Sequence, residues 1–234
     1  MAGRVYGEKV SIDTKGTVSF YNQRAKTIKN REQEYTTVLL GDQDPDYAVK
    51  WDEYEKGFIL PKLELNRNKV ILDLGCGGGG NLERWLECYP DAHVSGIDHS
   101  PVSVSIAEGW NEKAISQDRC EVILSGVNKL PFRNDSFDAI SSFESIYFWK
   151  NMDKALAEAY RVLKPGGVLL LAVTHDKESK CCSLTKKIHG ARLYDEAELK
   201  AYLENAGFLK FRYIRAKKKP WRIALCRKGI PVEL

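Results

Sequence analysis

From Lys69 onward, short apolar runs of strand type alternate with segments of helical periodicity. The apolar runs lie at 69–74, 93–98, 120–126, 136–143 and 167–173. After the first run, Leu82, Trp85 and Leu86 recur at the spacing of one helical face. The run at 167–173, GVLLLAV, is nearly all apolar, as expected for a strand covered on both faces. Strands that alternate with helices predict a parallel sheet with helices packed on both sides.

Capping residues predict where several helices begin and end. The Ser-Pro pair at 100–101 places a capping side chain directly before a proline in the first helical position. Asn151 can cap a helix that continues to the Lys-Pro-Gly-Gly sequence at 164–167, where proline and glycine end it. Asp195 and Glu198 have the spacing of a capping box, which predicts the start of another helix.

Two further β-type runs, 208–216 and 221–228, flank a Lys-Lys-Lys-Pro turn and predict a terminal hairpin. Together with the five earlier runs, they predict an α/β fold. The expected architecture is a doubly wound, mostly parallel seven-stranded sheet with an antiparallel C-terminal hairpin.

The first part of the chain, residues 1–60, lacks this rhythm of strands and helices. An aromatic stripe follows one face of a predicted helix there, formed by Tyr47, Trp51, Tyr54 and Phe58. We interpret this part as an N-terminal helical arm or lid, with Tyr21 and Arg24 as candidates to close over a site. Residues 61–234 then form the main, ligand-binding domain.

Composition narrows the class of protein. The chain has 234 residues, of which 43% are hydrophobic and 29% charged, as in ordinary globular proteins. No apolar stretch approaches the roughly 20 residues that span a bilayer, and the N-terminus lacks the apolar block of a secretory signal. The six cysteines form no C-x-x-C pair and are expected to be free thiols. We therefore expect a cytoplasmic protein with no membrane contact.

Net charge and the spacing of Cys and His residues say less about the function. The net charge of +4 is too small to indicate a nucleic-acid partner by itself. Basic residues do gather near the C-terminus: Arg212, Arg215, Lys217, Lys218, Lys219, Arg222, Arg227 and Lys228. They fit a solvated hairpin, or a patch for an anionic substrate or RNA. His175, Cys181, Cys182 and His189 match no zinc-binding spacing, so no metal site is expected.

The glycine-rich segment at 71–81, ILDLGCGGGGN, follows the first predicted strand and is the main candidate binding loop. Its glycines fit both G-x-G-x-G and the G-x-G-x-x-G of dinucleotide binders. Asp73 would oppose a pyrophosphate but favour an ammonium or sulfonium ligand, or else cap the turn. Asp98 ends the second strand, 23 positions after Gly75, where a carboxylate accepts hydrogen bonds from ribose hydroxyls or caps the next helix. These residues predict an adenosine ligand.

Four segments in this order carry a resemblance to a known family: VILDLGCGGG, GIDHSPVSV, LPFRNDSFDAI and YRVLKPGGVLLL. Together they resemble the class I S-adenosylmethionine-dependent methyltransferases, in particular the group that methylates small molecules. The resemblance covers roughly residues 65–175 and implies a Rossmann-like methyltransferase fold with S-adenosylmethionine as cofactor.

The resemblance also implies roles for individual residues. Asp73 and the backbone of Gly75, Cys76 and Gly77 are expected to hold the methionine part of the cofactor. The remaining contacts are expected from Asp98 to the ribose, His99 beside the adenine, Val127 against the adenine and Phe143 along the methionine side. Many relatives carry an acidic residue at the position of Gly126, which leaves adenine recognition here to backbone groups around Val127.

The acceptor side follows the fourth and fifth strands. Methyl transfer from a sulfonium chiefly needs donor and acceptor held close and aligned, and a general base only if the acceptor arrives protonated. The candidates for catalytic roles are Glu144, Tyr147 and His175. Tyr147, Phe148 and Trp149 are also candidates for an aromatic wall, although core packing is the simpler interpretation of Phe148.

The expected function is transfer of a methyl group to an O, N or S atom of a small molecule. The alternatives are methylation of RNA or of a peptide or protein, a nicotinamide oxidoreductase, and a non-catalytic cofactor-binding subunit. Asp73 and the segments LPF…SFD and KPGG argue against the oxidoreductase. The sequence predicts neither the acceptor nor the oligomeric state.

Overall fold

A computed structural model describes residues 69–173, 176–177, 191–215 and 222–231. The predicted N-terminal arm, with its aromatic stripe and its boundary near residue 60, lies outside the described residues. The turn at 216–221 does so too, together with most of the loop that follows the fifth strand.

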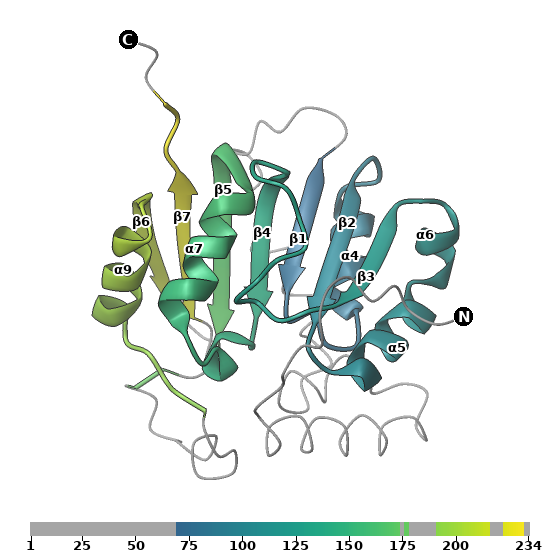
Figure 1. The fold of residues 1–234 in the computed structure, drawn as a ribbon, viewed down its shortest axis with the longest axis horizontal. Helices are drawn as coiled ribbons and strands as arrows, with labels where there is room; N and C mark the ends of the chain where they lie inside the picture. The colour runs from purple at the N-terminus through teal and green to yellow at the C-terminus, as the bar shows by residue number, and fades with distance from the viewer. Residues whose placement is uncertain (1–68, 174–175, 178–190, 216–221, 232–234) are drawn as a thin grey trace.

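Seven strands form one sheet, as predicted. They are β1 (Val70–Leu74), β2 (His93–Asp98), β3 (Cys120–Leu124), β4 (Phe137–Phe143), β5 (Leu163–Val173), β6 (Phe208–Arg215) and β7 (Arg222–Lys228). The strand order is β3-β2-β1-β4-β5-β7-β6. The first five strands are parallel, while β7 runs antiparallel to both β5 and β6. The doubly wound sheet and its antiparallel C-terminal hairpin are therefore confirmed (Figure 1).

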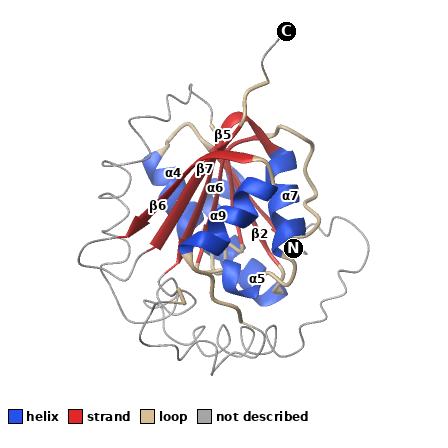
Figure 2. Cartoon of the chain, turned by 90° about the vertical axis from the view of Figure 1, so that its left-hand side faces the viewer, coloured by secondary structure: helices blue, strands red, loops and turns tan. Residues whose placement is uncertain are grey.

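The helices cover both faces of the sheet. They are α4 (Gly80–Cys88), α5 (Pro101–Trp110), α6 (Glu112–Ser116), α7 (Met152–Val162) and α9 (Glu196–Asn205), with a short 3-10 helix, η3 (Ile146–Phe148). Buried residues of α7 and α9 pack in one apolar core, and those of α4 and α5 pack in a second core on the opposite face. Figure 2 shows the strands twisted between these layers. Within the described part of the chain, no helix has the length and apolarity needed to cross a bilayer.

The predicted capping residues lie where expected. The side chains of Ser100, Asn151 and Asp195 each accept a hydrogen bond from the backbone of the helix that they precede. Asp195 and Glu198 form the complete capping box. These bonds satisfy amide groups that the first turn of a helix leaves without partners.

Strand β5 begins earlier than the sequence predicts. The predicted strand starts at Gly167, whereas the strand begins at Leu163, which pairs with Phe137. The pairing register then shifts before Ala139 pairs with Val168. The Lys-Pro-Gly-Gly sequence therefore ends the helix, as predicted, but forms an irregular part of the strand instead of a separate turn.

The order of strands determines where a ligand can bind. The chain leaves β1 toward β2 on one side, and the fourth strand returns to the other side of β1. In open α/β sheets, ligands bind at the carboxyl ends of the strands where the order reverses. Here that position lies beyond Leu74 of β1 and Phe143 of β4, at the lower edge of the sheet in Figure 1.

Candidate functional site

The glycine loop, defined here as Gly75–Gly79, turns sharply at the carboxyl end of β1. Gly75, Gly77 and Gly79 have φ angles of 75°, 55° and 87°. This left-handed region strains residues with a Cβ, so the loop conformation requires glycine. The amides of Gly75 and Cys76 both donate to the carbonyl of Ile97, at 2.9 Å. The loop is therefore fixed to the neighbouring strand β2.

Asp98, at the end of β2, connects the glycine loop to helix α5. Its Oδ2 accepts a hydrogen bond from Gly77 N at 3.0 Å, and its Oδ1 accepts one from Ser100 N at 2.8 Å. The side chain of His99 lies beside it, with Nδ1 3.7 Å from Oδ1. A carboxylate has about four acceptor positions, so these two amide bonds leave capacity for ribose hydroxyls. The helix-cap interpretation and the ribose interpretation are thus compatible.

Asp73 lies beside the loop, but its carboxyl group is completely buried. Ser141 Oγ donates to Asp73 Oδ1 at 2.7 Å, and Trp85 Nε1 donates to the same hydroxyl at 3.0 Å. Asn81 acts on the same carboxyl group as a hydrogen-bond partner, although Asp73 Oδ2 has no bond of standard geometry among the described residues. Burial, with a smaller contribution from the charge of Asp98, raises the pKa of Asp73 to about 7, and hydrogen bonds with Ser141 and Asn81 act in the opposite direction. Without a ligand, Asp73 therefore keeps its proton up to about pH 7, and a cationic ligand nearby would favour the charged form.

The turn after β3 carries the residues expected beside the adenine. Val127 is half-buried against the core of the α7 face. A Cβ built at Gly126 would meet nothing within 4 Å among the described atoms. The position where many relatives carry an acidic side chain is therefore open. Asn128 Oδ1, next in the chain, is buried without a hydrogen-bond partner in the described structure.

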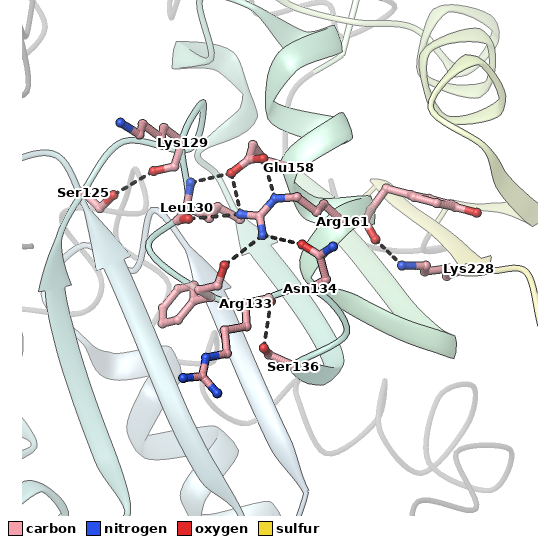
Figure 3. Close-up of polar contacts among 11 residues, drawn as sticks. Ser125, Lys129, Leu130, Arg133, Asn134, Ser136, Glu158, Arg161 and Lys228 are labelled. Atoms are coloured by element: carbon pink, nitrogen blue, oxygen red, sulfur yellow. Dashed lines mark hydrogen bonds and ion pairs between the residues drawn. The ribbon is translucent and has the colours of Figure 1, made fainter. Parts of the chain in front are cut away.

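Helix α7 holds the connection between β3 and β4 that contains this turn (Figure 3). Arg161 donates five hydrogen bonds: two to Glu158, one each to the carbonyls of Leu130 and Phe132, and one to the Asn134 side chain. Glu158 Oε2 in turn accepts a bond from Leu130 N at 2.7 Å. These side chains satisfy backbone groups of a connection that has no regular secondary structure.

The end of β4 lies against the glycine loop. A Cβ at Gly75 would come within 2.6 Å of both Cβ and Oγ of Ser145. Ser145 Oγ donates to the carbonyl of Leu74 at 2.8 Å and accepts a bond from Trp149 Nε1 at 3.2 Å. Its contact with Ser142 Oγ is 2.7 Å. Because the single proton of Ser145 is directed to Leu74, Ser142 is the donor in that pair.

Glu144, directly before Ser145, combines burial with an unusual backbone. Its φ is 53°, a conformation that costs energy in a residue with a Cβ and that clusters at functional sites. Its amide extends the sheet by donating to the carbonyl of Ala172 at 2.9 Å. Tyr147 donates to Glu144 Oε1 at 3.2 Å. The structure therefore brings together two of the three predicted catalytic residues.

The aromatic residues after β4 pack on the core. Tyr147 and Trp149 are buried in it, at 2% and 6% exposure, and Phe148 is half-buried and packs against it. Core packing, which was expected for Phe148, therefore describes all three residues, and Tyr147 and Trp149 do not form an exposed aromatic wall. Phe143, predicted along the methionine side, is itself buried in the core of the α4 and α5 face.

Several predicted residues lie outside the described part of the chain. They are His175, the third predicted catalytic residue, together with His189, Cys181, Cys182, Tyr21 and Arg24. Conversely, the sequence-based prediction missed Ser141, Ser145 and Asn111, all of which contact the loop or Asp73. For Ser141 a signal existed, since a serine within an otherwise apolar strand needs a buried hydrogen-bond partner.

Comparison with known proteins agrees with this arrangement. A protein family described as "Methyltransferase domain" matches residues 72–171. The sequence is 35% identical over 191 residues to 24-methylenesterol C-methyltransferase 2 of Arabidopsis thaliana, covering 71% of this chain and 51% of that protein. It is 36% identical over 107 residues to erythromycin 3''-O-methyltransferase of Saccharopolyspora erythraea, covering 46% and 35%. The chain thus spans about half or less of the length of these curated relatives.

Residues 72–171 belong to this methyltransferase-domain family, and the matches support a class I S-adenosylmethionine-dependent methyltransferase. Solved structures agree on the fold. A methyltransferase in complex with the Trm112 methyltransferase activator of Haloferax volcanii aligns with a TM-score of 0.66 at 19% identity, covering 91% of this chain and 97% of that one. Phosphoethanolamine N-methyltransferase 2 of Haemonchus contortus, in complex with S-adenosyl-L-methionine, aligns with a TM-score of 0.62 at 17% identity, covering 88% and 60%.

S-adenosylmethionine is the cofactor of this methyltransferase family, and the described residues fit it. Gly75, Gly77 and Gly79 carry no side chain, and the side chain of Cys76 is buried. Asp98 retains acceptor capacity, and the Cβ direction of Gly126 is open. Three features that fit the cofactor thus lie at the carboxyl ends of three adjacent strands. They are the glycine loop after β1, the carboxylate of Asp98 at the end of β2 and the unobstructed position of Gly126 after β3.

Proposed function

We propose that the chain transfers the methyl group of S-adenosylmethionine to a small-molecule acceptor. The observation that carries this proposal is the contact of Gly75 with Ser145, because it places the cofactor loop directly beside the β4 turn that contains Glu144. Donor side and acceptor side then meet at the reversal of strand order, where open α/β sheets bind ligands.

The cofactor would be held by residues from four strand ends. The backbone of Gly75, Cys76 and Gly77 would hold the methionine part, with Phe143 nearby, and Asp73 would act through its charge. Asp98 would bind the ribose, His99 would lie beside the adenine and Val127 would pack against it. The bound cofactor supplies a methyl group on a good leaving group, so the task of the chain is mainly alignment, which contributes about 7–11 kcal/mol.

The acceptor would meet Glu144. This carboxylate is 9% exposed and is held by its backbone and by the hydroxyl of Tyr147. It can therefore orient an acceptor or receive its proton, which typically adds 10²–10⁴-fold to the rate. Tyr147 is nearly buried, so we assign it to positioning Glu144. His175 stays a candidate base on the grounds of sequence alone.

The kind of acceptor follows from the relatives and from the surface charges. The two relatives are named for sterols and erythromycin, which are small molecules modified at carbon and oxygen. We therefore extend the proposed acceptor atoms from O, N and S to carbon. Against an RNA acceptor, several basic residues of the hairpin bind acidic groups. Arg222 pairs with Asp176 at 2.8 Å and Lys228 with Asp135 at 2.7 Å.

Ligand titration tests the proposal. We expect the full chain to bind S-adenosylmethionine and S-adenosylhomocysteine in calorimetry, and NADH not at all. Asp98→Ala removes hydrogen bonds to a charged acceptor and should weaken S-adenosylhomocysteine binding on the order of 10–100-fold. Glu87→Ala, which removes an exposed carboxylate paired with Arg84, serves as the matched control.

Tight NADH binding without S-adenosylmethionine binding would contradict the proposal. The acceptor class is then tested with methyl-labelled cofactor against metabolite, RNA and protein pools. If the label enters RNA or protein but no small molecule, the proposed acceptor class is wrong. The proposed methyl transfer itself would still be supported.

A further inference from the structure

Asn111, which follows helix α5, contacts the glycine loop but has not yet been assigned a function. Its Nδ2 donates to the carbonyl of Gly79 and to the carbonyl of Ala107, both at 3.0 Å. The residue is 4% exposed. An amide NH₂ group has two protons, and here both are used on backbone carbonyls.

Gly79 lies directly on helix α5. A Cβ at Gly79 would come within 2.6 Å of Asn111 Nδ2 and within 2.8 Å and 2.9 Å of Ala107 Cβ and Cα. The contact with Ala107 Cα means that the loop touches the helix backbone itself. Gly79 must therefore be glycine both for its φ of 87° and for this close approach.

The other part of the loop is tied to the start of the same helix. Gly77 N donates to Asp98 Oδ2, and Asp98 Oδ1 accepts the amide of Ser100, the N-cap of α5. Helix α5 thus holds the loop at Gly77 through its first turn and at Gly79 through its last. The Gly79 carbonyl also accepts bonds from Leu82 N and Glu83 N, so Asn111 fixes the first turn of α4 too.

We propose that Asn111 is a positioning residue for the cofactor, because it holds the Gly79 end of the loop in the conformation that binds S-adenosylmethionine. This inference rests on the proposed function. A run of glycines has the largest conformational freedom to lose, and binding is tighter when a loop is ordered before the ligand arrives. Asn111 makes no contact with the cofactor in this assignment and acts through the backbone of Gly79.

The test uses S-adenosylhomocysteine titration of the full chain and of two variants. Asn111→Asp keeps the shape but turns acceptor oxygens toward two carbonyls, and Asn111→Leu keeps the volume without any donor. We expect both variants to bind S-adenosylhomocysteine about tenfold more weakly or worse, since the loss of one hydrogen bond corresponds to roughly that factor. Each titration is run well below the thermal midpoint of that variant.

Trp110→Phe is the matched control. Trp110 Nε1 donates to Glu83 Oε2 at 2.7 Å, an exposed bond that also joins α5 to α4 but does not touch the loop. We expect the control to bind within about twofold of the wild type, as is usual for exposed polar contacts.

Three results would count against the inference. If both Asn111 variants melt at lower temperature but bind S-adenosylhomocysteine as the wild type does, Asn111 has a structural role only and the inference is overturned. If Trp110→Phe weakens binding as much as the Asn111 variants, the effect comes from α5 packing in general. If the wild type binds neither S-adenosylmethionine nor S-adenosylhomocysteine, the proposed function fails together with the inference.

Discussion

Asp73 makes the stability of the domain sensitive to pH. Its pKa of about 7 lies above the ordinary value of 3.8, because burial disfavours the charged form. Between these two values the folded chain keeps a proton that the unfolded chain releases. The free energy of unfolding therefore falls as the pH rises from about 4 to about 7, by at most about 1.4 kcal/mol per pH unit. Above pH 7 this loss is complete.

Asp73→Asn, which cannot ionise, should lack this decline. Urea unfolding at pH 5 and pH 8 measures it: we expect the wild type to lose on the order of 2–3 kcal/mol more than the variant over this interval. Glu87→Gln, at an exposed position, should follow the wild type. Equal losses in wild type and Asp73→Asn would mean that the carboxyl does not carry the proton.

At the scale of single residues, the sequence predicts some of the contacts in the candidate site and misses others. Asp98 was found because its distance from Gly75 along the chain follows a known rule for ribose binding. Asn111 and Ser145 were not, because their partners Gly79 and Leu74 lie 32 and 71 positions away. A side chain bonded to a distant carbonyl leaves no periodic signal in the sequence, so only the folded chain reveals it.

At the scale of elements, helix α7 is responsible for the shape of the connection between β3 and β4. Arg161→Ala removes five hydrogen bonds, three of them to groups of that connection. We expect the free energy of unfolding to fall by about 2–4 kcal/mol, because the partly buried carbonyls of Leu130 and Phe132 and the carboxylate of Glu158 lose their partner. Chemical denaturation of wild type and variant measures the change.

Arg84→Ala provides the control for Arg161→Ala. Arg84 and Glu87 form an Arg–Glu pair at 2.6 Å on α4, an exposed contact whose side chains are 31% and 54% exposed. Exposed pairs contribute about 0–1 kcal/mol, so this variant should stay close to the wild type. A similar loss for both arginines would show that Arg161 acts only as an ordinary surface ion pair.

The elements themselves were largely predictable. Strand β2 has the predicted bounds, and the capping residues Ser100, Asn151 and Asp195 lie as expected, because both signals are local. Helix α6, of five residues, was missed because one turn has no periodicity to read. The early start of β5 was missed because proline and glycine predict an interruption, whereas pairing with β4 continues around it.

At the scale of the whole molecule, ligand binding should stabilise the fold. A ligand that binds only the folded state at 100 times its dissociation constant adds about 2.7 kcal/mol. For a domain of this size, we expect S-adenosylhomocysteine to raise the thermal midpoint by roughly 5–10 °C. NADH at the same concentration should leave it unchanged. Calorimetric scanning measures both, and an equal shift with the two ligands would contradict a site specific for the sulfonium cofactor and its product.

The contact of Gly75 with Ser145 restricts how the chain can change over generations. The methylene and hydroxyl of Ser145 occupy the volume that any side chain at position 75 would need. An alanine at 75 would still be strained by the φ of 75° even after position 145 had lost its side chain, and that first step removes the bonds to Leu74 and Trp149. Whichever of the two positions changes first, the single mutant is less stable than the starting protein. Across distant relatives, we expect the two positions to change together or not at all.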